Sequence, residues 1–278
     1  MARHTGSRAR SGAFTPMFVA GARVFIMRKR ALARWIGVAA LLMLETSASG
    51  LLTPGQAQAD RVDRSITPAD MVRHAYAEVE RRHAMLRLAK DTRESLLRLQ
   101  ELDQAGRQVL GQAHINNLSE PQRTVAWASV WAVINRYDIE CQRRLKLLMP
   151  PGGWFRASIV GKDGAKAAFL IVQHAVNDPQ LMRSVAQIIA LFVPEGEASG
   201  SSLALITDRI ALEFDHKPQT YGTQVACVDG KWSATDVVNP EHLDERRRRV
   251  GLNAELDYLK NFDDAECPSV KPAGPIGR

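Results

Sequence analysis

Residues 167–192, with the sequence AAFLIVQHAVNDPQLMRSVAQIIALF, decide the fold. The apolar run 167–172 predicts a helix that is buried on most of its surface, and from residue 181 apolar residues recur every three or four positions. Asp178 followed by Pro179 is typical of a helix start, because Asp caps free backbone N–H groups and Pro fits the first turn. We therefore expect two consecutive helices at the centre of the core.

The sequence predicts a β-hairpin and further helices on either side of this pair. Between residues 223–228 and 231–237 lies Asp229-Gly230, a two-residue turn that needs positive φ at both positions and is typical of a β-hairpin. Apolar residues with helical spacing occupy 67–86, 91–111, 119–148 and 203–214. Asn239-Pro240 and Gly251 mark the two ends of a further helix, and a last short helix is expected at 254–262.

These patterns predict three parts of the chain. Residues 60–263 are expected to form a mostly α-helical single domain with one β-hairpin, and they are numerous enough for a sizeable core. The Pro- and Gly-rich segment 264–278 is expected to be a disordered tail. Residues 1–59 differ in composition from the rest and indicate a targeting segment.

The basic charge of the chain is concentrated in this first segment. Residues 1–59 hold eight of the 37 Lys and Arg residues and one of the 30 Asp and Glu residues, which leaves 29 of each beyond Ala59. A chain that is neutral beyond this point offers no electrostatic case for binding nucleic acid. We therefore expect no nucleic-acid partner.

The targeting segment has the order of a secretory signal, and we expect this signal to start at Met27. Basic residues follow this methionine, then the apolar stretch Trp35 to Leu44, then Ala57-Gln58-Ala59 before Asp60. The apolar stretch is too short to span a bilayer. We expect a periplasmic or secreted protein that has no membrane contact after signal removal; the alternative is an inner-membrane anchor through an uncleaved signal.

The three cysteines, Cys141, Cys227 and Cys267, are too few and too scattered for a disulfide framework or a metal cluster. In an oxidising compartment Cys227 and Cys267 can pair and hold the tail to the hairpin. The alternative is that Cys141 and Cys227 are small buried apolar residues. The sequence leaves both interpretations open.

Gln173 and His174 leave the buried helix and need hydrogen-bond partners. His174 is the candidate for acid/base catalysis, although a lone His on an apolar face is more often a satisfied core residue. Asp208 is the expected partner that orients the imidazole, and Arg209 is expected to hold an anionic substrate group bidentately. Alternatively, Asp208 and Arg209 form an internal ion pair.

A second polar stretch enters the hairpin at residues 219–224, where Gly222 allows close backbone approach. Its hydroxyl and amide groups suit the orientation of a polar ligand, and they suit hydrogen bonding to buried helix ends equally well. The ligand-binding candidates in this stretch are Gln219, Tyr221, Thr223 and Gln224.

Three further groups of charged residues do not by themselves indicate a functional site. Asp103 and Arg107 lie one turn apart on a predicted helix, which is the spacing of a surface ion pair. His174 and Asp178 have the same spacing, but two ligands do not make a metal site, and we predict neither metal nor cofactor. The run 246–249 is all Arg and follows acidic residues, so a solvated face is expected, with one or two side chains free to point inward.

Several of these motifs resemble a known bacterial family, domain of unknown function 6624, over roughly residues 99–259. Two positions depart from the family pattern: Val176 replaces an Asp after Gln-His-Ala, and Phe155 replaces a Pro after Gly-Trp. The resemblance implies a functional role for Asp103, Gln104 and Arg107, but no activity. The motifs that carry it are Asp103-Gln104-x-x-Arg107, Gly153-Trp154, Gln173-His174-Ala175, Thr207-Asp208-Arg209 and Gln219-x-Tyr221-Gly222-Thr223-Gln224.

Two functions of different classes fit these residues. The chain has no nucleophile elbow, zinc-protease helix, Cys-x-x-Cys or phosphate loop, which removes several well-known enzyme classes. The first hypothesis is a polar cleft that performs hydrolysis or group transfer with His174 as base. The second is a non-catalytic envelope protein or binding module whose polar motif is a structural network. In either case the expected partner is an unknown small-molecule or peptide ligand.

Overall fold

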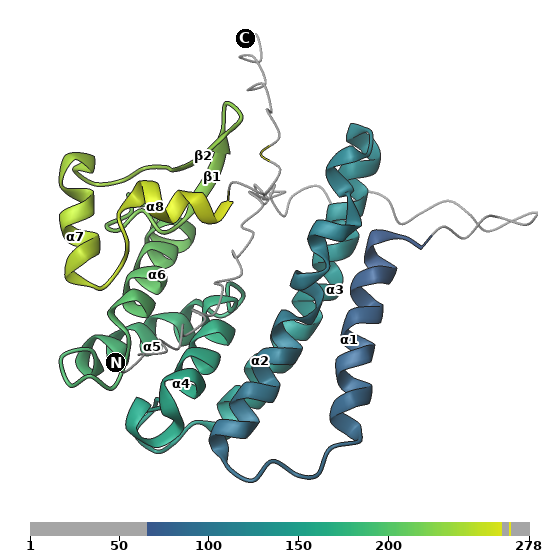
Figure 1. The fold of residues 1–278 in the computed structure, drawn as a ribbon, viewed down its shortest axis with the longest axis horizontal. Coiled ribbons are helices and arrows are strands. Elements are labelled where there is room, and N and C mark those ends of the chain that lie inside the picture. Colours follow the sequence, from purple (N-terminus) through teal and green to yellow (C-terminus); the bar gives the residue numbers. More distant parts are fainter. Residues whose placement is uncertain (1–65, 263–266, 268–278) are drawn as a thin grey trace, which may run out of the picture. The chain divides into compact units, whose positions relative to one another are not determined.

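The computed structural model describes residues 66–262 and Cys267 (Figure 1). The predicted targeting segment 1–59 and, apart from Cys267, the predicted tail lie outside the described residues. Within the described part, the chain forms eight α-helices and one two-stranded antiparallel sheet. The prediction of a mostly α-helical fold with one hairpin is therefore confirmed.

Three helices begin directly after a capping side chain, one of which is the predicted cap Asp178. The side chains of Thr67, Asp91 and Asp178 each accept a hydrogen bond from the backbone N–H three residues further on. The helices are α1 (Pro68–Ala84), α2 (Thr92–Gln108), α3 (Glu120–Leu148), α4 (Ala157–Gln173), α5 (Pro179–Phe192), α6 (Gly200–Ile210), α7 (Leu243–Arg249) and α8 (Glu255–Leu259). Short 3-10 turns occupy Leu110–Ala113, Ile115–Asn117, Pro240–His242 and Lys260–Phe262, and a π turn occupies Ala211–Asp215.

Asp163 precedes the apolar run 167–172 and is of a residue type that caps helices, but helix α4 begins earlier than this residue. It starts at Ala157 and is interrupted at Gly161, whose φ of 75° and ψ of 159° are not helical. Asp163 instead binds Arg93 of α2 through both carboxylate oxygens, with Nε–Oδ1 at 2.9 Å and Nη2–Oδ2 at 2.5 Å. This pair attaches the first part of α4 to α2.

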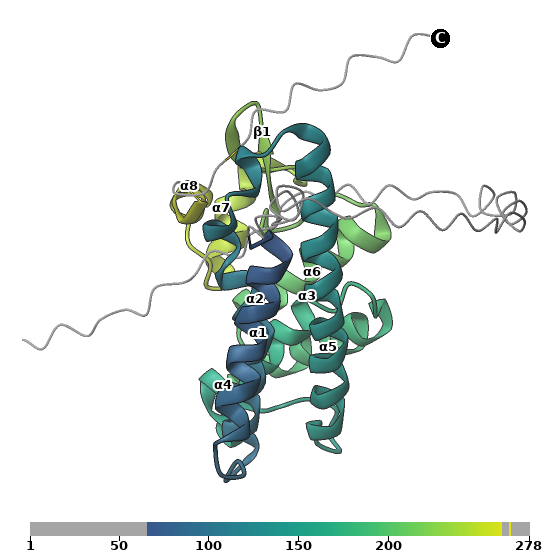
Figure 2. The same ribbon diagram turned by 90° about the vertical axis from the view of Figure 1, so that its right-hand side faces the viewer.

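Helices α1, α2 and α3 lie side by side, and α4 packs against α2 (Figures 1 and 2). Gly106 allows the close approach of α1 and α2, because a Cβ at this position would lie 2.4 Å from a ring carbon of Tyr76. The Tyr76 ring in turn stacks on that of Tyr137 from α3, with the ring centroids 3.7 Å apart. The three helices thus meet around one buried aromatic pair beside the polar residues described below.

Helix α5 packs against α6 and α4, and the side chains of its inner face belong to the core, as the sequence predicts. Met182, Val185 and Ile189 are almost fully buried there. Because these residues recur every three or four positions, they form one continuous apolar face. Among the helices described, none combines the length and the apolar character that crossing a membrane requires.

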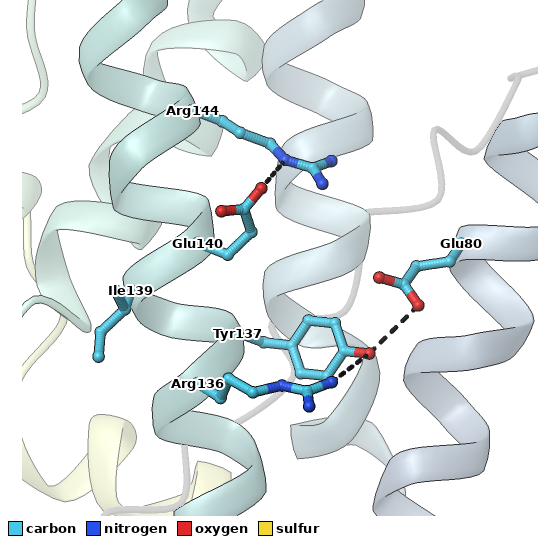
Figure 3. A pocket seen from close by; sticks show the side chains of 6 residues that line it. All are labelled: Glu80, Arg136, Tyr137, Ile139, Glu140 and Arg144. Carbon is cyan, nitrogen blue, oxygen red and sulfur yellow. Dashed lines mark hydrogen bonds and ion pairs between the residues drawn. The ribbon is translucent and has the colours of Figure 1, made fainter.

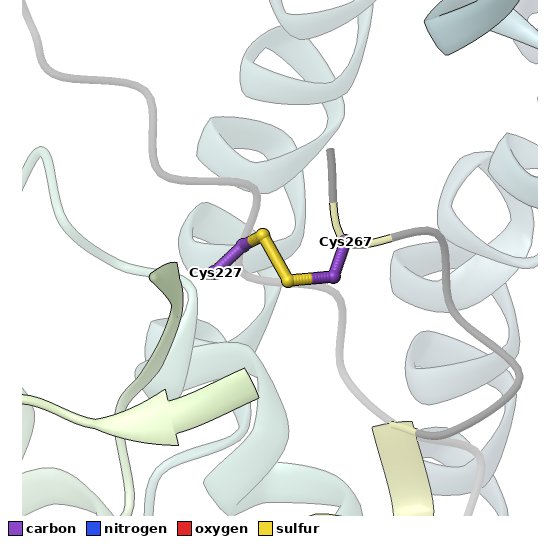
Figure 4. Close-up of a disulfide and its surroundings, with 2 residues drawn as sticks. All are labelled: Cys227 and Cys267. Atoms are coloured by element: carbon purple, nitrogen blue, oxygen red, sulfur yellow. A yellow bond between two sulfur atoms is a disulfide. The ribbon is translucent and has the colours of Figure 1, made fainter. Parts of the chain in front are cut away.

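The predicted hairpin is present as strands β1 (Val225–Val228) and β2 (Lys231–Ala234), joined by Asp229 and Gly230 with φ of 50° and 75°. A disulfide joins Cys227 of β1 to Cys267 (Figure 4). The structure therefore contains the pairing that the sequence left open. Cys141 is a buried free thiol on α3, as the apolar interpretation of that residue predicts.

Candidate functional site

Asp103 of α2 and His174, the residue that caps the end of α4, form a buried pair. Both carboxylate oxygens of Asp103 lie close to Nδ1 of His174, at 3.0 and 2.8 Å. The Asp103 side chain is fully buried, and only 4% of the His174 side chain is exposed. The interpretation of Asp103 as half of a surface ion pair is therefore wrong. Asp103 lies on the core face of α2, beside Leu99 and Leu102.

Arg107 binds a second buried carboxylate, that of Asp138 on α3. The contact is bidentate, with Nη1–Oδ1 at 2.8 Å and Nη2–Oδ2 at 2.9 Å. Nη1 also donates to the backbone oxygen of Asp103 at 3.0 Å and lies 4.0 Å from its carboxylate. Gln104 completes the group by donating to Oδ2 of Asp103 at 2.7 Å. We call these residues, together with His174, the dyad cluster.

Sequence reasoning missed Asp138, although a signal for it exists. Asp138 follows Ile134 by four positions and precedes Cys141 by three, so it stands in the apolar stripe of α3. A carboxylate at a core position of a helix requires a partner, because an unpaired buried charge is costly. Gln142 lies in the same stripe, is also buried and donates to Asn177 at 2.8 Å.

The surroundings shift the pKa values of the Asp103 and Asp138 carboxyl groups in opposite directions. Burial alone raises the pKa of Asp103, but the attraction of His174 and Arg107 and the hydrogen bonds from His174 and Gln104 outweigh it, so this pKa lies below its usual value. Burial raises the pKa of Asp138 above its usual value, and the bound Arg107 offsets this only in part. Asp103 is thus the ionised partner of the imidazole.

Asp103, Asp138 and His174 have the ligand types of a metal site, and one ligand atom from each lies within 4.8 Å of the others. However, Arg107 already contacts both oxygens of Asp138 and approaches Asp103. A divalent cation would have to displace this guanidinium or share the carboxylates with it against charge repulsion. We therefore assign the cationic role in this cluster to Arg107.

Asp208 of α6 does not orient His174, and that part of the sequence interpretation is wrong. Its carboxylate accepts hydrogen bonds from the backbone N–H groups of Thr220, Tyr221 and Thr223, at 2.8, 3.0 and 2.9 Å, and from the Thr223 hydroxyl at 2.9 Å. Three converging backbone donors satisfy a buried carboxylate in the manner of an anion-binding turn. Asp208 therefore anchors the 220–223 turn to α6.

The other polar residues of this stretch also serve the turn. Gln219 donates to the backbone oxygens of Gln224 and Thr235 at 2.9 and 2.7 Å, and it accepts from the backbone N–H of Gln224 at 2.8 Å. Gln224 donates its side-chain amide to the Thr223 hydroxyl at 3.1 Å. Tyr221 takes part through its backbone, whose oxygen accepts from Arg247 at 2.7 Å.

Arg247 is one of the inward-pointing side chains that the sequence allows in the 246–249 run. Its side chain is fully buried on α7 and donates to the backbone oxygens of Tyr221 and Gly222. The Tyr258 hydroxyl of α8 donates to the backbone oxygen of Thr223 at 2.9 Å. We call the residues around Asp208 the turn cluster: Asp208, Gln219, Thr223, Gln224, Arg247 and Tyr258.

Arg209 and Gln173 belong to neither set of hydrogen bonds within the described part of the chain. Arg209 is 6% exposed, and its Nε and Nη2 have no hydrogen-bond partner there. The same holds for both side-chain atoms of Gln173, which is 1% exposed. The proposed ion pair between Asp208 and Arg209 is absent from the described residues, so that alternative is wrong.

Most of the polar side chains that the sequence assigns to a single cleft belong to these two hydrogen-bonded clusters. Two surface hollows of about 420 and 370 Å³ lie elsewhere, along α1, α2 and α3. Figure 3 shows the larger one, where the Tyr137 hydroxyl donates to Glu80 at 3.2 Å. Neither hollow is lined by His174, Asp208 or Arg209.

Replacing Arg107 with Met should destabilise the protein by about 3–5 kcal/mol, because Asp138 and Asp103 then lose the cation that compensates their burial. Urea unfolding of both proteins measures this change. The matched control is Arg143→Met, which removes an exposed arginine that binds both carboxylate oxygens of Glu140 on α3. The control should change stability little. An equal loss in the two variants would contradict the account.

The comparisons with known proteins identify a family for this chain. A family of unknown function, DUF6624, matches residues 90–271, which include every residue of the two clusters. The comparison with curated proteins found no match, and the comparison with solved structures found none either. Because the family matches well over half of the chain, this protein belongs to the DUF6624 family of unknown function.

Proposed function

We propose that the dyad cluster is a general acid/base site for hydrolysis or group transfer, with His174 as the catalytic residue. One observation carries the proposal: a fully buried carboxylate, Asp103, places both of its oxygens within 3.0 Å of Nδ1 of His174. A carboxylate in this position fixes the orientation and tautomer of an imidazole. It also stabilises the imidazolium that forms when the imidazole takes up a proton.

The chemistry follows from which ring nitrogen faces the carboxylate. Nδ1–H donates to Asp103, so Nε2 carries the lone pair that accepts a proton from water or from a substrate hydroxyl. The oxygen so activated forms a bond to a carbonyl carbon or a phosphorus atom, and His174 returns the proton to the leaving group. Asp103 remains ionised throughout, in line with its lowered pKa.

Arg107 and Asp138 act as positioning residues in this scheme. Their bidentate contact links α2 to α3, and the bond from Arg107 to the Asp103 backbone holds the carboxylate in its place. Val176, where the resembling family has an Asp, is 42% exposed. The carboxylate of the dyad comes from α2, so the scheme does not depend on an acid at position 176.

A second candidate function is a non-catalytic binding module in which the polar motifs specify the fold. The turn cluster favours it, because the hydrogen bonds of Asp208 and Arg247 end on the 220–223 turn and on neighbouring backbone. Asp208, Gln219, Thr223 and Gln224 therefore have an architectural explanation. His174 and Asp103 decide between the two candidates.

His174→Gln and Asp103→Asn should each reduce turnover by roughly 100-fold or more, because acid/base catalysis and the orientation of its base are lost. The measurement is a panel of aryl carboxylic esters, phosphate monoesters and peptides, with circular dichroism to confirm folding. His83→Gln is the matched control, since His83 forms a surface pair with Glu101 at 2.7 Å and should leave turnover unchanged.

Two results would reject the catalytic proposal in favour of the second candidate. One is a panel on which the wild-type protein turns over no substrate while both variants unfold at lower temperature. The other is turnover that survives unchanged in both variants.

We also propose that the protein works outside the cytoplasm, in the periplasm or as a secreted protein. The signal-like segment after Met27 supports this, and so does the Cys227–Cys267 disulfide, because such bonds persist in oxidising compartments. Expression from Met27 in a bacterial host should give periplasmic protein whose mass corresponds to a chain beginning at Asp60 with Cys141 as its one free thiol. A retained Leu32 or three free thiols would contradict this.

A further inference from the structure

The guanidinium of Arg209 has one edge, formed by Nε and Nη2, that suits an anion with two oxygens. This edge is buried and has no hydrogen-bond partner in the described part of the chain. Nε–H and Nη2–H point in the same direction from the planar group, and they are the two atoms that find no partner in the described part of the chain. Only 6% of the residue is exposed, so water does not solvate this edge freely. A buried cationic donor pair of this kind calls for an acceptor.

Two other arginines of the same chain show what this edge binds. Arg93 uses Nε and Nη2 to hold both oxygens of Asp163, at 2.9 and 2.5 Å. Arg143 does the same with Glu140, at 2.8 Å for each contact. Parallel N–H groups at this spacing match the two oxygens of a carboxylate or a phosphate.

We propose that Arg209 binds the carboxylate or phosphate group of a ligand side-on, as the anion subsite of the proposed active site. This inference rests on the proposed function for its role in catalysis, and on the geometry of Arg209 for the chemistry of the ligand. Gln173, one residue before His174, adds a side-chain amide whose Nε2 and Oε1 are both buried and without a partner in the described chain. An amide of this kind recognises a polar group of the same ligand.

The charges around Arg209 agree with an anionic ligand. Burial lowers the pKa of Arg209 to about 10; Glu213 opposes this shift, and the nearby positive charge of Arg107 reinforces it. Arg107 belongs to the dyad cluster, so Arg209 lies within electrostatic reach of the residues that hold His174. Two arginines that repel each other in a buried region are both stabilised when an anion binds between or beside them.

The experiment compares the thermal unfolding of the full mature protein in inorganic phosphate, in acetate and in chloride at equal ionic strength. Phosphate or acetate should raise the unfolding midpoint of the wild-type protein above that in chloride, because a ligand of the folded state stabilises it. Arg209→Met should abolish this rise. Arg209→Lys should weaken the anion affinity by about tenfold or more, since Lys has the charge without the fork. The anion that gives the larger rise identifies the ligand group as phosphate or carboxylate.

Two further variants, Arg93→Met and His174→Gln, and the stability of Arg209→Met itself make the test specific. Arg93→Met removes a guanidinium whose same edge is occupied by Asp163, so it should keep the full anion response. Arg209→Met should also unfold at a higher temperature than the wild type in chloride, because it removes a buried cation that lacks a partner. His174→Gln should retain the anion response, which separates a failure of the catalytic proposal from a failure of this one.

The proposal is overturned if neither phosphate nor acetate raises the wild-type midpoint, or if Arg209→Met responds to them as the wild type does. A lower unfolding temperature of Arg209→Met in chloride would also overturn it, because the guanidinium would then support the fold itself.

Discussion

The ionised carboxylate of Asp103, buried between helices, is the constraint on which the rest of the site depends. A buried charge is tolerated only when opposite charge and hydrogen bonds compensate its desolvation. Here His174 and Gln104 bind the carboxylate, and Arg107 adds the cation. These contacts connect α2 to α4, and the Arg107–Asp138 pair connects α2 to α3. Because the packed helices bury the Asp103 carboxylate, this carboxylate needs a hydrogen-bond donor. The His174 imidazole is therefore held in the orientation that places Nδ1 against it.

In the turn cluster, buried charges are also compensated by hydrogen bonds, and there these bonds hold the backbone in place. Asp208 is a buried carboxylate whose partners include backbone N–H groups, and Arg247 is a buried cation whose Nε and Nη1 donate to backbone oxygens while its Nη2 has no partner in the described chain. Together they fix the 220–223 turn between α6 and α7, ahead of the disulfide-bonded hairpin. Arg209, the neighbour of Asp208, differs because the described chain offers no acceptor to its Nε–Nη2 edge. That contrast separates residues that hold the fold from one that is suited to a ligand.

Much of the fold could be predicted from local signals. Caps such as Thr67 and Asp178, helical spacing and the Asp229-Gly230 turn are short-range features, and the structure contains them. The partners within the site could not be predicted, because Asp103 and His174 are 71 positions apart and spacing carries no information about which helices pack together. Local spacing even misled, since Asp103 and Arg107 have the separation of a surface pair. Asp138 was detectable in principle as a charge in an apolar stripe.

The most direct test of this account is the nitrogen-15 and proton spectrum of the His174 ring in histidine-labelled protein. The account predicts that Nδ1 carries a proton that exchanges slowly with solvent, because it donates to the buried Asp103 carboxylate. In Asp103→Asn this proton signal should shift or disappear. A ring that is protonated only at Nε2, or signals that are identical in the wild type and Asp103→Asn, would contradict the assignment of Asp103 and His174 as a catalytic pair.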